Sequence, residues 1–311
     1  MRAVLIRVFF VSLVAAAAAA HEASAAPARE TWPWHAWLTA GLSAIGLLYG
    51  VGAWRLRKRE PSALSLGAIA AFAAGLATLF VALVSPLDRW SEELFSAHMT
   101  QHELLMVVAA PLMVLGRPLV PMLWALPAAW RQRLGRGLRA PACRTVWRFV
   151  TGPIVVWVLH GAALWILHLP SLFEAALADR LFHAFQHACF FWTAALFWWA
   201  VAHGRYGRIG YGLSVLFVFT TALHSGALGA LLTWSSSVWY GSYAHRAPAW
   251  GALEDQQLAG LIMWVPAGVT FVVVGLALFA AWIGESERRV AHGRTASMTA
   301  QPGVGAPRGP A

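Results

Sequence analysis

The chain alternates long apolar runs with short polar stretches, and this pattern predicts helices that cross a membrane. A helix needs about 20 mostly apolar residues to span the hydrocarbon core of a bilayer. Seven stretches meet this length, with predicted bounds of 34–54, 64–84, 95–115, 149–169, 181–203, 210–233 and 259–283. Because backbone in lipid must satisfy its own hydrogen bonds, we expect an all-α, polytopic membrane protein with seven transmembrane helices.

The two ends of the chain differ from these spans. The N-terminus carries two arginines, an apolar run and the small residues Ala23, Ser24 and Ala25, which is typical of a cleavable signal peptide; an uncleaved first span is the alternative. The C-terminal stretch is rich in Pro, Gly and Ala, which favours disorder. We therefore expect a signal peptide (1–26), a seven-helix transmembrane domain (34–285) and a disordered cytoplasmic tail (286–311).

Positive charges concentrate in alternate loops, which predicts the orientation in the membrane. Loops with several basic residues follow the first, third, fifth and seventh spans, whereas each intervening loop has one arginine accompanied by acids. Cytoplasmic loops carry the excess of Lys and Arg, so the N-terminus should lie outside and the C-terminus inside. This orientation agrees with a signal peptide and places the protein in the plasma (inner) membrane of a bacterium as a multi-pass protein.

Composition excludes several classes of protein. Hydrophobic residues make up 59% of the chain and charged residues 12%, which is too little polar surface for a soluble domain. The topology accounts for the net charge of +10, so membrane lipid is the expected contact and nucleic acid is not. Cys143 lies in an Arg-rich loop and Cys189 inside a span, so we expect no disulfide between them.

Histidines gather in the outer half of the predicted membrane domain. Spans three and five enter from outside, and each begins with a His-x-x-x-His pair. Residues four apart share a helix face about 6 Å from each other, so both imidazoles of a pair can bind one ion. The histidines that map to this depth, and that we consider candidate metal ligands, are His98, His102, His160, His168, His183, His187 and His224.

Met106 extends the face of His98 and His102 by one turn, and we include it among the candidate metal ligands. Imidazole with a thioether favours copper, particularly Cu(I), although zinc would be satisfied by imidazoles alone. A single transmembrane histidine can instead make an interhelical hydrogen bond, and this alternative stays open for His160, His168 and His224.

Two acids near these ligands have less direct roles. Glu103 points about 100° round the helix from His102, so we expect it to orient a ligand from a neighbouring helix; proton relay and a protonated contact between helices are the alternatives. Asp255 lies at the outer surface before span seven, where it either supports the metal site or is an ordinary loop acid. The preceding aromatic loop, SSSVWYGSYAHRAPAWGALEDQQ, either caps the outer cavity or anchors in the membrane interface.

Three segments together resemble a known family. They read SPLDRWSEELFSAHMTQHELLMVVAAPLMVLGRPL, HAFQHACFFWTAALFWW and DQQLAGLIMWVPAG. They are similar to the CtaG family of caa3-type cytochrome c oxidase assembly factors, and the similarity covers about residues 40–285. The resemblance implies a membrane protein needed to assemble active haem-copper oxidase, with cytochrome c oxidase subunits as partners and periplasmic copper donors as further candidates. It implies no catalysis, so we do not expect an enzyme.

Several functions remain to be weighed. In the first, the protein is a copper chaperone with His98, His102, His183 and His187 as core ligands. In the second, histidines from facing helices bind a b-type haem, and in the third the protein is a metal-free assembly scaffold. Membrane hydroxylases and desaturases use adjacent histidines on the cytoplasmic side, and this chain has no His-His pair. No inverted repeat supports a transporter.

Overall fold

The computed structural model describes residues 36–203, 211–246 and 248–299. The predicted signal peptide, the loop arginines Arg205 and Arg208 and residues 300–311 lie outside the described residues. Every element in the described part of the chain is helical, and no strand occurs there. The all-α prediction is therefore confirmed.

The elements follow the predicted order. The long helices are α2 (Ala36–Arg59), α3 (Leu66–Val84), α10 (Pro153–Leu167), α12 (Arg180–His203), α14 (Tyr211–Thr233) and α16 (Ala252–Thr299). The third predicted span consists of α5 (Phe95–Glu103), the π-helix η2 (Leu104–Ala109) and α6 (Ala110–Leu115). Short helices connect them: η1 (Pro61–Ala63), α4 (Pro86–Glu93), α7 (Leu119–Ala125), α8 (Ala128–Arg139), α9 (Pro141–Val150), α11 (Pro170–Ala178) and α15 (Gly241–Ala244).

Four single helices are long and apolar enough to cross a membrane: α2, α3, α14 and the first part of α16. Two bent pairs raise the number to six, because α5–α6 meets α7 at 62° and α9 meets α10 at 57°. Helix α12 has 24 residues but does not belong to this apolar set. The described residues thus support four to six spans, and the seventh remains a prediction.

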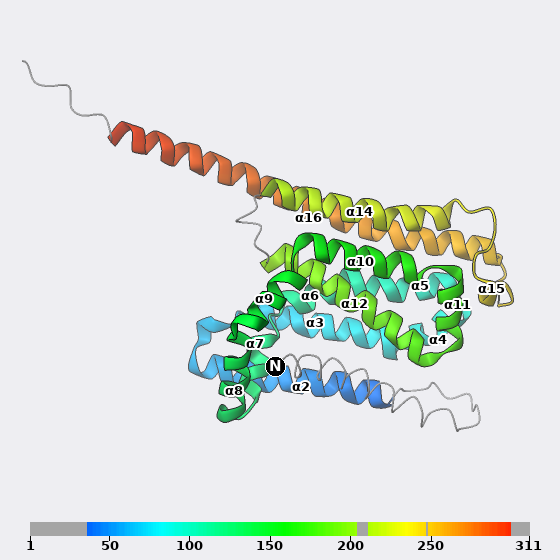
Figure 1. The fold of residues 1–311 in the computed structure, drawn as a ribbon. Helices are drawn as coiled ribbons and strands as arrows, with labels where there is room; N and C mark the ends of the chain where they lie inside the picture. The colour runs from blue at the N-terminus through cyan, green and yellow to red at the C-terminus, as the bar shows by residue number, and fades with distance from the viewer. Residues whose placement is uncertain (1–35, 204–210, 247, 300–311) are drawn as a thin grey trace, which may run out of the picture.

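The long helices form a bundle whose ends differ (Figure 1). Helices α14 and α16 lie side by side on one flank, α2 and α3 lie towards the other, and α5, α10 and α12 lie between them. The short helices α4, α11 and α15 cover one end. Helix α16 projects beyond the bundle and continues to Thr299, so residues 286–299 of the predicted disordered tail are helical.

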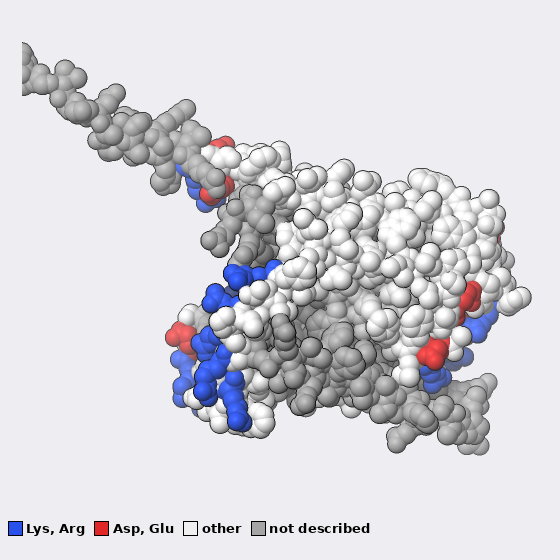
Figure 2. Space-filling model, in the orientation of Figure 1, with Lys and Arg blue, Asp and Glu red and all other residues white. Residues whose placement is uncertain are grey.

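The end opposite α4, α11 and α15 is strongly basic. Figure 2 shows Lys and Arg gathered there. Helices α8 and α9 supply much of this charge with Arg131, Arg133, Arg136, Arg139, Arg144 and Arg148. The predicted positive-inside orientation requires such a separation of charge along the bundle, and this end would then face the cytoplasm.

Glycines allow α14 and α16 to approach closely. A Cβ atom on Gly260 would lie 2.6 Å from the carbonyl oxygen of Gly229 and 2.5 Å from Oγ1 of Thr233. Small residues at such contacts let helix backbones pack against each other in a membrane, where the hydrophobic effect does not drive association. This contact holds α16 against the rest of the bundle and thereby positions the residues of its first turns.

Candidate metal centre

Five histidines from three helices meet near the end of the bundle that α4, α11 and α15 cover. Ring centroids are 4.5 Å apart for His98 and His102, and 4.2 Å apart for His183 and His187. The pairs face each other, because His98 lies 5.1 Å from His183 and His102 lies 5.1 Å from His187. His168 completes the group at 5.6 Å from His102. We refer to His98, His102, His168, His183 and His187 as the five-histidine cluster.

The cluster is enclosed by protein. His98, His102, His168 and His187 are buried and His183 is partly buried. Aromatic rings fill the space between them: Phe173 lies 5.1 Å from His98, and Phe190 lies 4.6 Å from His102. Neighbours of this kind offer no hydrogen bonds to the imidazole nitrogens.

Hydrogen bonds define the tautomer of two rings. The hydroxyl of Tyr243 donates its proton to the carbonyl oxygen of Ser91 at 2.7 Å, so His98 Nδ1, 3.0 Å from the same hydroxyl, must be the donor in that contact. Nδ1 of His168 lies 2.7 Å from the carbonyl oxygen of Leu164 and must also donate. In both rings Nε2 therefore keeps its lone pair, as a metal ligand requires.

These lone pairs lack partners. Nε2 of His98, His168 and His187 and both ring nitrogens of His102 are buried and make no hydrogen bond in the structure. Leaving such a buried polar atom unsatisfied costs about 1–3 kcal/mol, and a bound ion would remove that cost. One ring nitrogen from each of His98, His183 and His187 lies within 4.8 Å of the other two.

This trio can provide a three-coordinate site. Tetrahedral Zn–N bonds of about 2.0–2.1 Å imply nitrogen atoms roughly 3.3 Å apart, so small rotations of the rings suffice to close the site. Three protein ligands leave the fourth position open, which is the arrangement of a site that exchanges a ligand rather than of a closed structural site.

The loop between α14 and α16 covers the cluster. Besides the Tyr243 contact, the hydroxyl of Tyr240 donates to the carbonyl oxygen of His168 at 2.9 Å. Burial raises the pKa of both tyrosines well above the usual value, so both remain neutral hydrogen-bond donors. Tyr240 and Tyr243 therefore cap the cluster, and for these two aromatic residues the cap is favoured over an anchor in the membrane interface. The sequence contains no signal that separates Tyr243 from the other aromatics of the loop.

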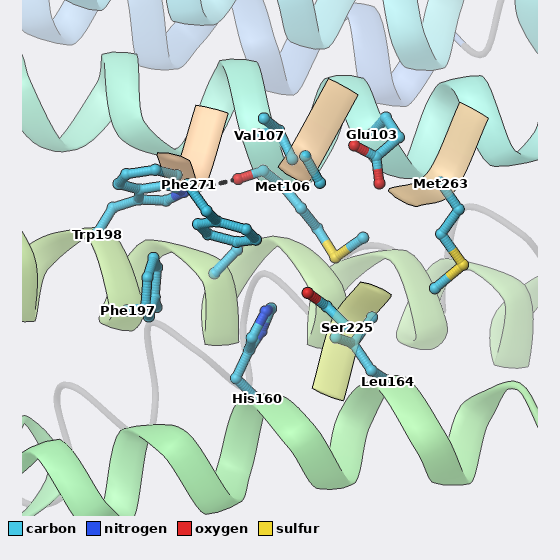
Figure 3. Close-up of a pocket in the computed structure, with 12 residues that line it drawn as sticks. Glu103, Met106, Val107, His160, Leu164, Phe197, Trp198, Ser225, Met263 and Phe271 are labelled. Atoms are coloured by element: carbon cyan, nitrogen blue, oxygen red, sulfur yellow. Dashed lines mark hydrogen bonds between the residues drawn. The ribbon is translucent and has the colours of Figure 1, made fainter. Parts of the chain in front are cut away.

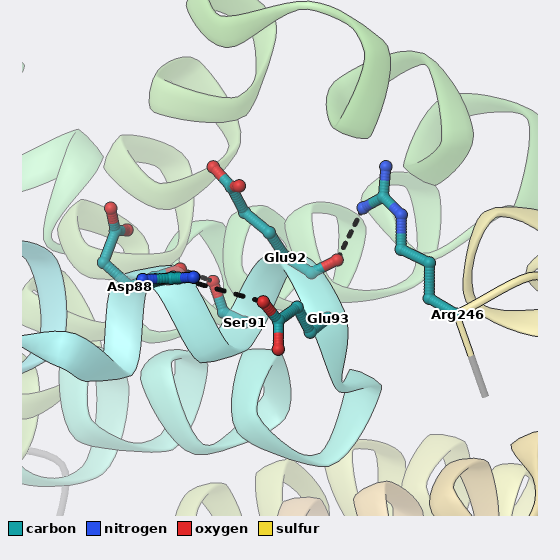
Figure 4. Close-up of polar contacts among 6 residues, drawn as sticks. Asp88, Ser91, Glu92, Glu93 and Arg246 are labelled. Atoms are coloured by element: carbon teal, nitrogen blue, oxygen red, sulfur yellow. Dashed lines mark hydrogen bonds and ion pairs between the residues drawn. The ribbon is translucent and has the colours of Figure 1, made fainter. Parts of the chain in front are cut away.

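Two further contacts fix this loop. The backbone nitrogen of Ser242 donates to Oε1 of Glu174 at 3.1 Å, and its hydroxyl donates to Oε2 of the same carboxylate. Arg246 donates to the carbonyl oxygen of Glu92 at 2.6 Å (Figure 4). The loop is thus attached to both α11 and α4.

Asp255 caps the helix that carries His98 and His102. Its Oδ2 accepts hydrogen bonds from the backbone nitrogens of Phe95 at 2.7 Å and Ser96 at 3.4 Å, and its Oδ1 accepts one from the Ser96 hydroxyl at 2.5 Å. The first backbone N–H groups of a helix have no intrahelical partner, so this carboxylate satisfies two of them. Asp255 therefore supports the cluster indirectly, because its hydrogen bonds to Phe95 and Ser96 hold the start of α5.

The other predicted residues form a second group, deeper in the bundle. Met106, Glu103 and His160 line one small cavity (Figure 3). Met106, which the sequence predicts on the face of His98 and His102, lines this cavity from η2. In this π-helix the backbone nitrogen of Ala110 bonds to the carbonyl oxygen of Leu105, five residues earlier, so the turn is wider than in an α-helix.

His224 belongs near this second group rather than to the five-histidine cluster. Its ring centroid lies 6.1 Å from that of His160 and 5.3 Å from that of Trp157. Neither of its ring nitrogens has a hydrogen-bond partner. The seven candidate histidines thus divide into five and two.

Comparison with known proteins assigns the family. The family model for cytochrome c oxidase caa3 assembly factors (Caa3_CtaG) matches residues 47–285. The chain belongs to this family. Uncharacterized proteins of Mycobacterium bovis and Mycobacterium leprae are 28% identical over 274 residues and 26% identical over 271 residues. These alignments cover 84% and 83% of this chain but 40% of each relative, and no solved structure matches.

In this Caa3_CtaG chain, glutamines within the histidine motifs have a structural role that sequence reasoning missed. Nε2 of Gln101, between His98 and His102 in the sequence, donates to the carbonyl oxygen of Ala82 at 2.7 Å and to Oδ1 of Asp88 at 3.0 Å. Nε2 of Gln186 donates to the carbonyl oxygen of Leu167 at 2.9 Å. Each glutamine ties a histidine-bearing helix to its neighbour, which explains a His-x-x-Gln-His spacing better than metal binding alone.

Proposed function

We propose that this chain binds copper in the five-histidine cluster and passes it to a subunit of a caa3-type cytochrome c oxidase. The observation that carries the proposal is the set of buried imidazole nitrogens, drawn from three helices, that have no hydrogen-bond partner. Family membership supplies the assembly role. The protein then acts as a chaperone and not as an enzyme.

The ligand chemistry suits a cargo ion. Neutral imidazoles bind Cu(II) more tightly than they bind the other divalent first-row metals. Tyr243 and Leu164 hold His98 and His168 with Nε2 free, so no proton has to leave Nε2 of these two rings when an ion enters. His183 is the least buried member of the cluster and provides the route by which copper would enter or leave.

We place the cluster on the outer side of the membrane. This orientation follows from seven spans, with α12 counted among them, and from a cleaved signal peptide. The basic end formed by α8 and α9 then faces the cytoplasm and the capped end faces the periplasm. A periplasmic copper donor would meet the loop of Tyr240 and Tyr243 first.

Metal analysis of the purified protein tests this function. The protein is isolated without a metal-binding tag, loaded with Cu(I) and compared with a His98→Ala/His187→Ala variant. His245→Ala is the matched control, because His245 is exposed and lies outside the cluster. We expect the double variant to lose one copper per chain and to abolish oxidase assembly in cells, whereas the control retains both.

Two outcomes would overturn the proposal. A Soret band in the isolated protein, lost in the double variant, would assign the cluster to a b-type haem. A wild-type protein that supports oxidase assembly but refuses Cu(I) would leave a metal-free scaffold.

A further inference from the structure

We propose that the chain has a second, sulfur-containing Cu(I) site, formed by Met106, Met263, His160 and Glu103. It lies outside the five-histidine cluster, and its existence does not depend on the function proposed above. Only its role as the next binding site for copper released by the five-histidine cluster rests on the proposed function.

The four side chains converge from different helices. They line a cavity of about 20 Å³, room for about one water-sized sphere. Met106 comes from η2, Met263 from α16, His160 from α10 and Glu103 from the end of α5. Figure 3 shows both thioethers, the imidazole and the carboxylate directed towards the same space. The rest of the lining is mainly apolar and aromatic.

His160 presents a lone pair to this cavity. The hydroxyl of Thr193 donates to the carbonyl oxygen of Cys189 at 2.8 Å, so its oxygen can only accept from Nδ1 of His160 at 3.2 Å. Nδ1 therefore carries the proton and Nε2 does not. A hydrogen bond to the far nitrogen is the usual way in which proteins orient an imidazole ligand.

Glu103 supplies a carboxyl group that lacks a partner. The side chain is buried, its Oε2 has no hydrogen-bond partner, and no salt bridge among the described residues involves it. Carboxylates inside a membrane domain are costly and are normally paired. A single monovalent cation that replaces the proton of this carboxyl group would keep the site neutral, whereas a divalent ion would leave an excess positive charge in an apolar surrounding.

The sulfur ligands select the ion. Thioethers are soft ligands that favour Cu(I), whereas magnesium, calcium and manganese prefer oxygen. Methionine often only fills gaps in a core. Here two methionines from separate helices border a cavity that also receives an imidazole and a carboxylate, and packing alone requires neither polar group. Met263 does not stand out in the sequence as a candidate ligand, because it lies inside an ordinary apolar span.

The second site lies deeper than the first. His160 precedes His168 by eight residues in the α10 segment, which corresponds to roughly 12 Å along a helix. On the other side, His102 and Met106 lie one turn apart on the same continuous helix. Copper that leaves the five-histidine cluster would therefore reach the sulfur site by moving one to two helical turns towards the membrane centre.

Metal stoichiometry and X-ray absorption test this inference. We expect the wild-type protein to bind two Cu(I) per chain, with sulfur among the scatterers. A Met106→Leu/Met263→Leu variant should lose one equivalent and all sulfur scattering while it still binds one Zn(II) at the histidines. Met113→Leu is the matched control, since Met113 does not line the cavity. Leucine conserves apolar volume, so the double variant should fold.

The results separate the two proposals. A double variant that retains two Cu(I), or a wild-type protein without sulfur scattering, would overturn the second site. A wild-type protein that binds one sulfur-ligated Cu(I) but no Zn(II), and that is unaffected by His98→Ala/His187→Ala, would support the second site and overturn the first.

Discussion

The hydroxyl of Tyr243 lies 3.0 Å from Nδ1 of His98, although the two residues are 145 positions apart in the chain. The same hydroxyl donates to the carbonyl oxygen of Ser91. A residue in the loop between α14 and α16 thus sets both the tautomer and the orientation of a buried imidazole. The loop that covers the cluster is therefore part of the candidate metal centre, although it contributes no ligand to the trio.

Replacement of this tyrosine should weaken copper binding without unfolding the protein. Tyr243→Phe removes the acceptor for the Nδ1 proton of His98, and loss of such an outer hydrogen bond typically lowers metal affinity by about 10–100-fold. Competition with a Cu(I) chelator measures the change. The matched control is Tyr49→Phe, whose hydroxyl donates to the carbonyl oxygen of Gly116 away from the cluster. Equal affinities in the two variants would contradict a positioning role for Tyr243.

Loss of the Asp255 carboxylate should destabilise the start of α5. Asp255→Ala leaves the backbone nitrogens of Phe95 and Ser96 without their acceptor, and the loss of a cap costs about 0.5–2 kcal/mol. Thermal unfolding in detergent measures this, and copper affinity should fall with it because α5 carries two of the histidines. Glu254→Ala, at an exposed neighbouring acid, should change neither property. A drop of similar size in both variants would point to surface charge instead of capping.

The contact between α14 and α16 should not tolerate a side chain at Gly260. Gly260→Ala introduces a Cβ within 2.6 Å of the carbonyl oxygen of Gly229, so the helices must separate and the unfolding temperature should fall. Gly268→Ala has nothing within 4 Å of the new Cβ and should leave the unfolding temperature unchanged or raise it. The reverse order of stabilities would show that the two backbones are farther apart than described.

Metal should stabilise the folded protein through the histidines. An ion that binds only the native state raises stability by about 2.7 kcal/mol when its concentration is 100 times its dissociation constant. We expect Zn(II) and Cu(I) to raise the unfolding temperature of the wild-type protein, and a chelator to reverse the shift. His98→Ala/His187→Ala should abolish the shift produced by Zn(II). An undiminished shift in that variant would locate the binding elsewhere.

Apolar run lengths are sufficient to predict the long helices, because the requirement for about 20 apolar residues leaves few alternatives; four to six of the seven predicted spans are supported by the described residues. Helical periodicity predicts that His98 lies beside His102 and His183 beside His187. In the structure their ring centroids are 4.5 Å and 4.2 Å apart. The two pairs come together because α12 packs against η2 and α6, which continue the helix that begins with α5, and no local pattern in the sequence reveals this packing.

Two features escaped the sequence for physical reasons. Periodicity assumes about 3.6 residues per turn, and the π-helix η2, which contains Met106, departs from that value. Asp255 reads as a loop acid because its target, the start of α5, is 160 residues away in the chain. Long-range hydrogen bonds of this kind depend on tertiary placement, so charge and spacing along the chain do not disclose them.

The wide turn η2 also joins the two proposed copper sites mechanically. The carbonyl oxygen of Met106 is held by Nε1 of Trp198 at 2.8 Å, so this part of the helix is attached to α12, which carries His183 and His187 (Figure 3). A helix behaves as a stiff rod over two turns, and any rotation that moves His102 must carry Met106 with it. We therefore expect an ion bound at one proposed site to alter the position of the ligands at the other.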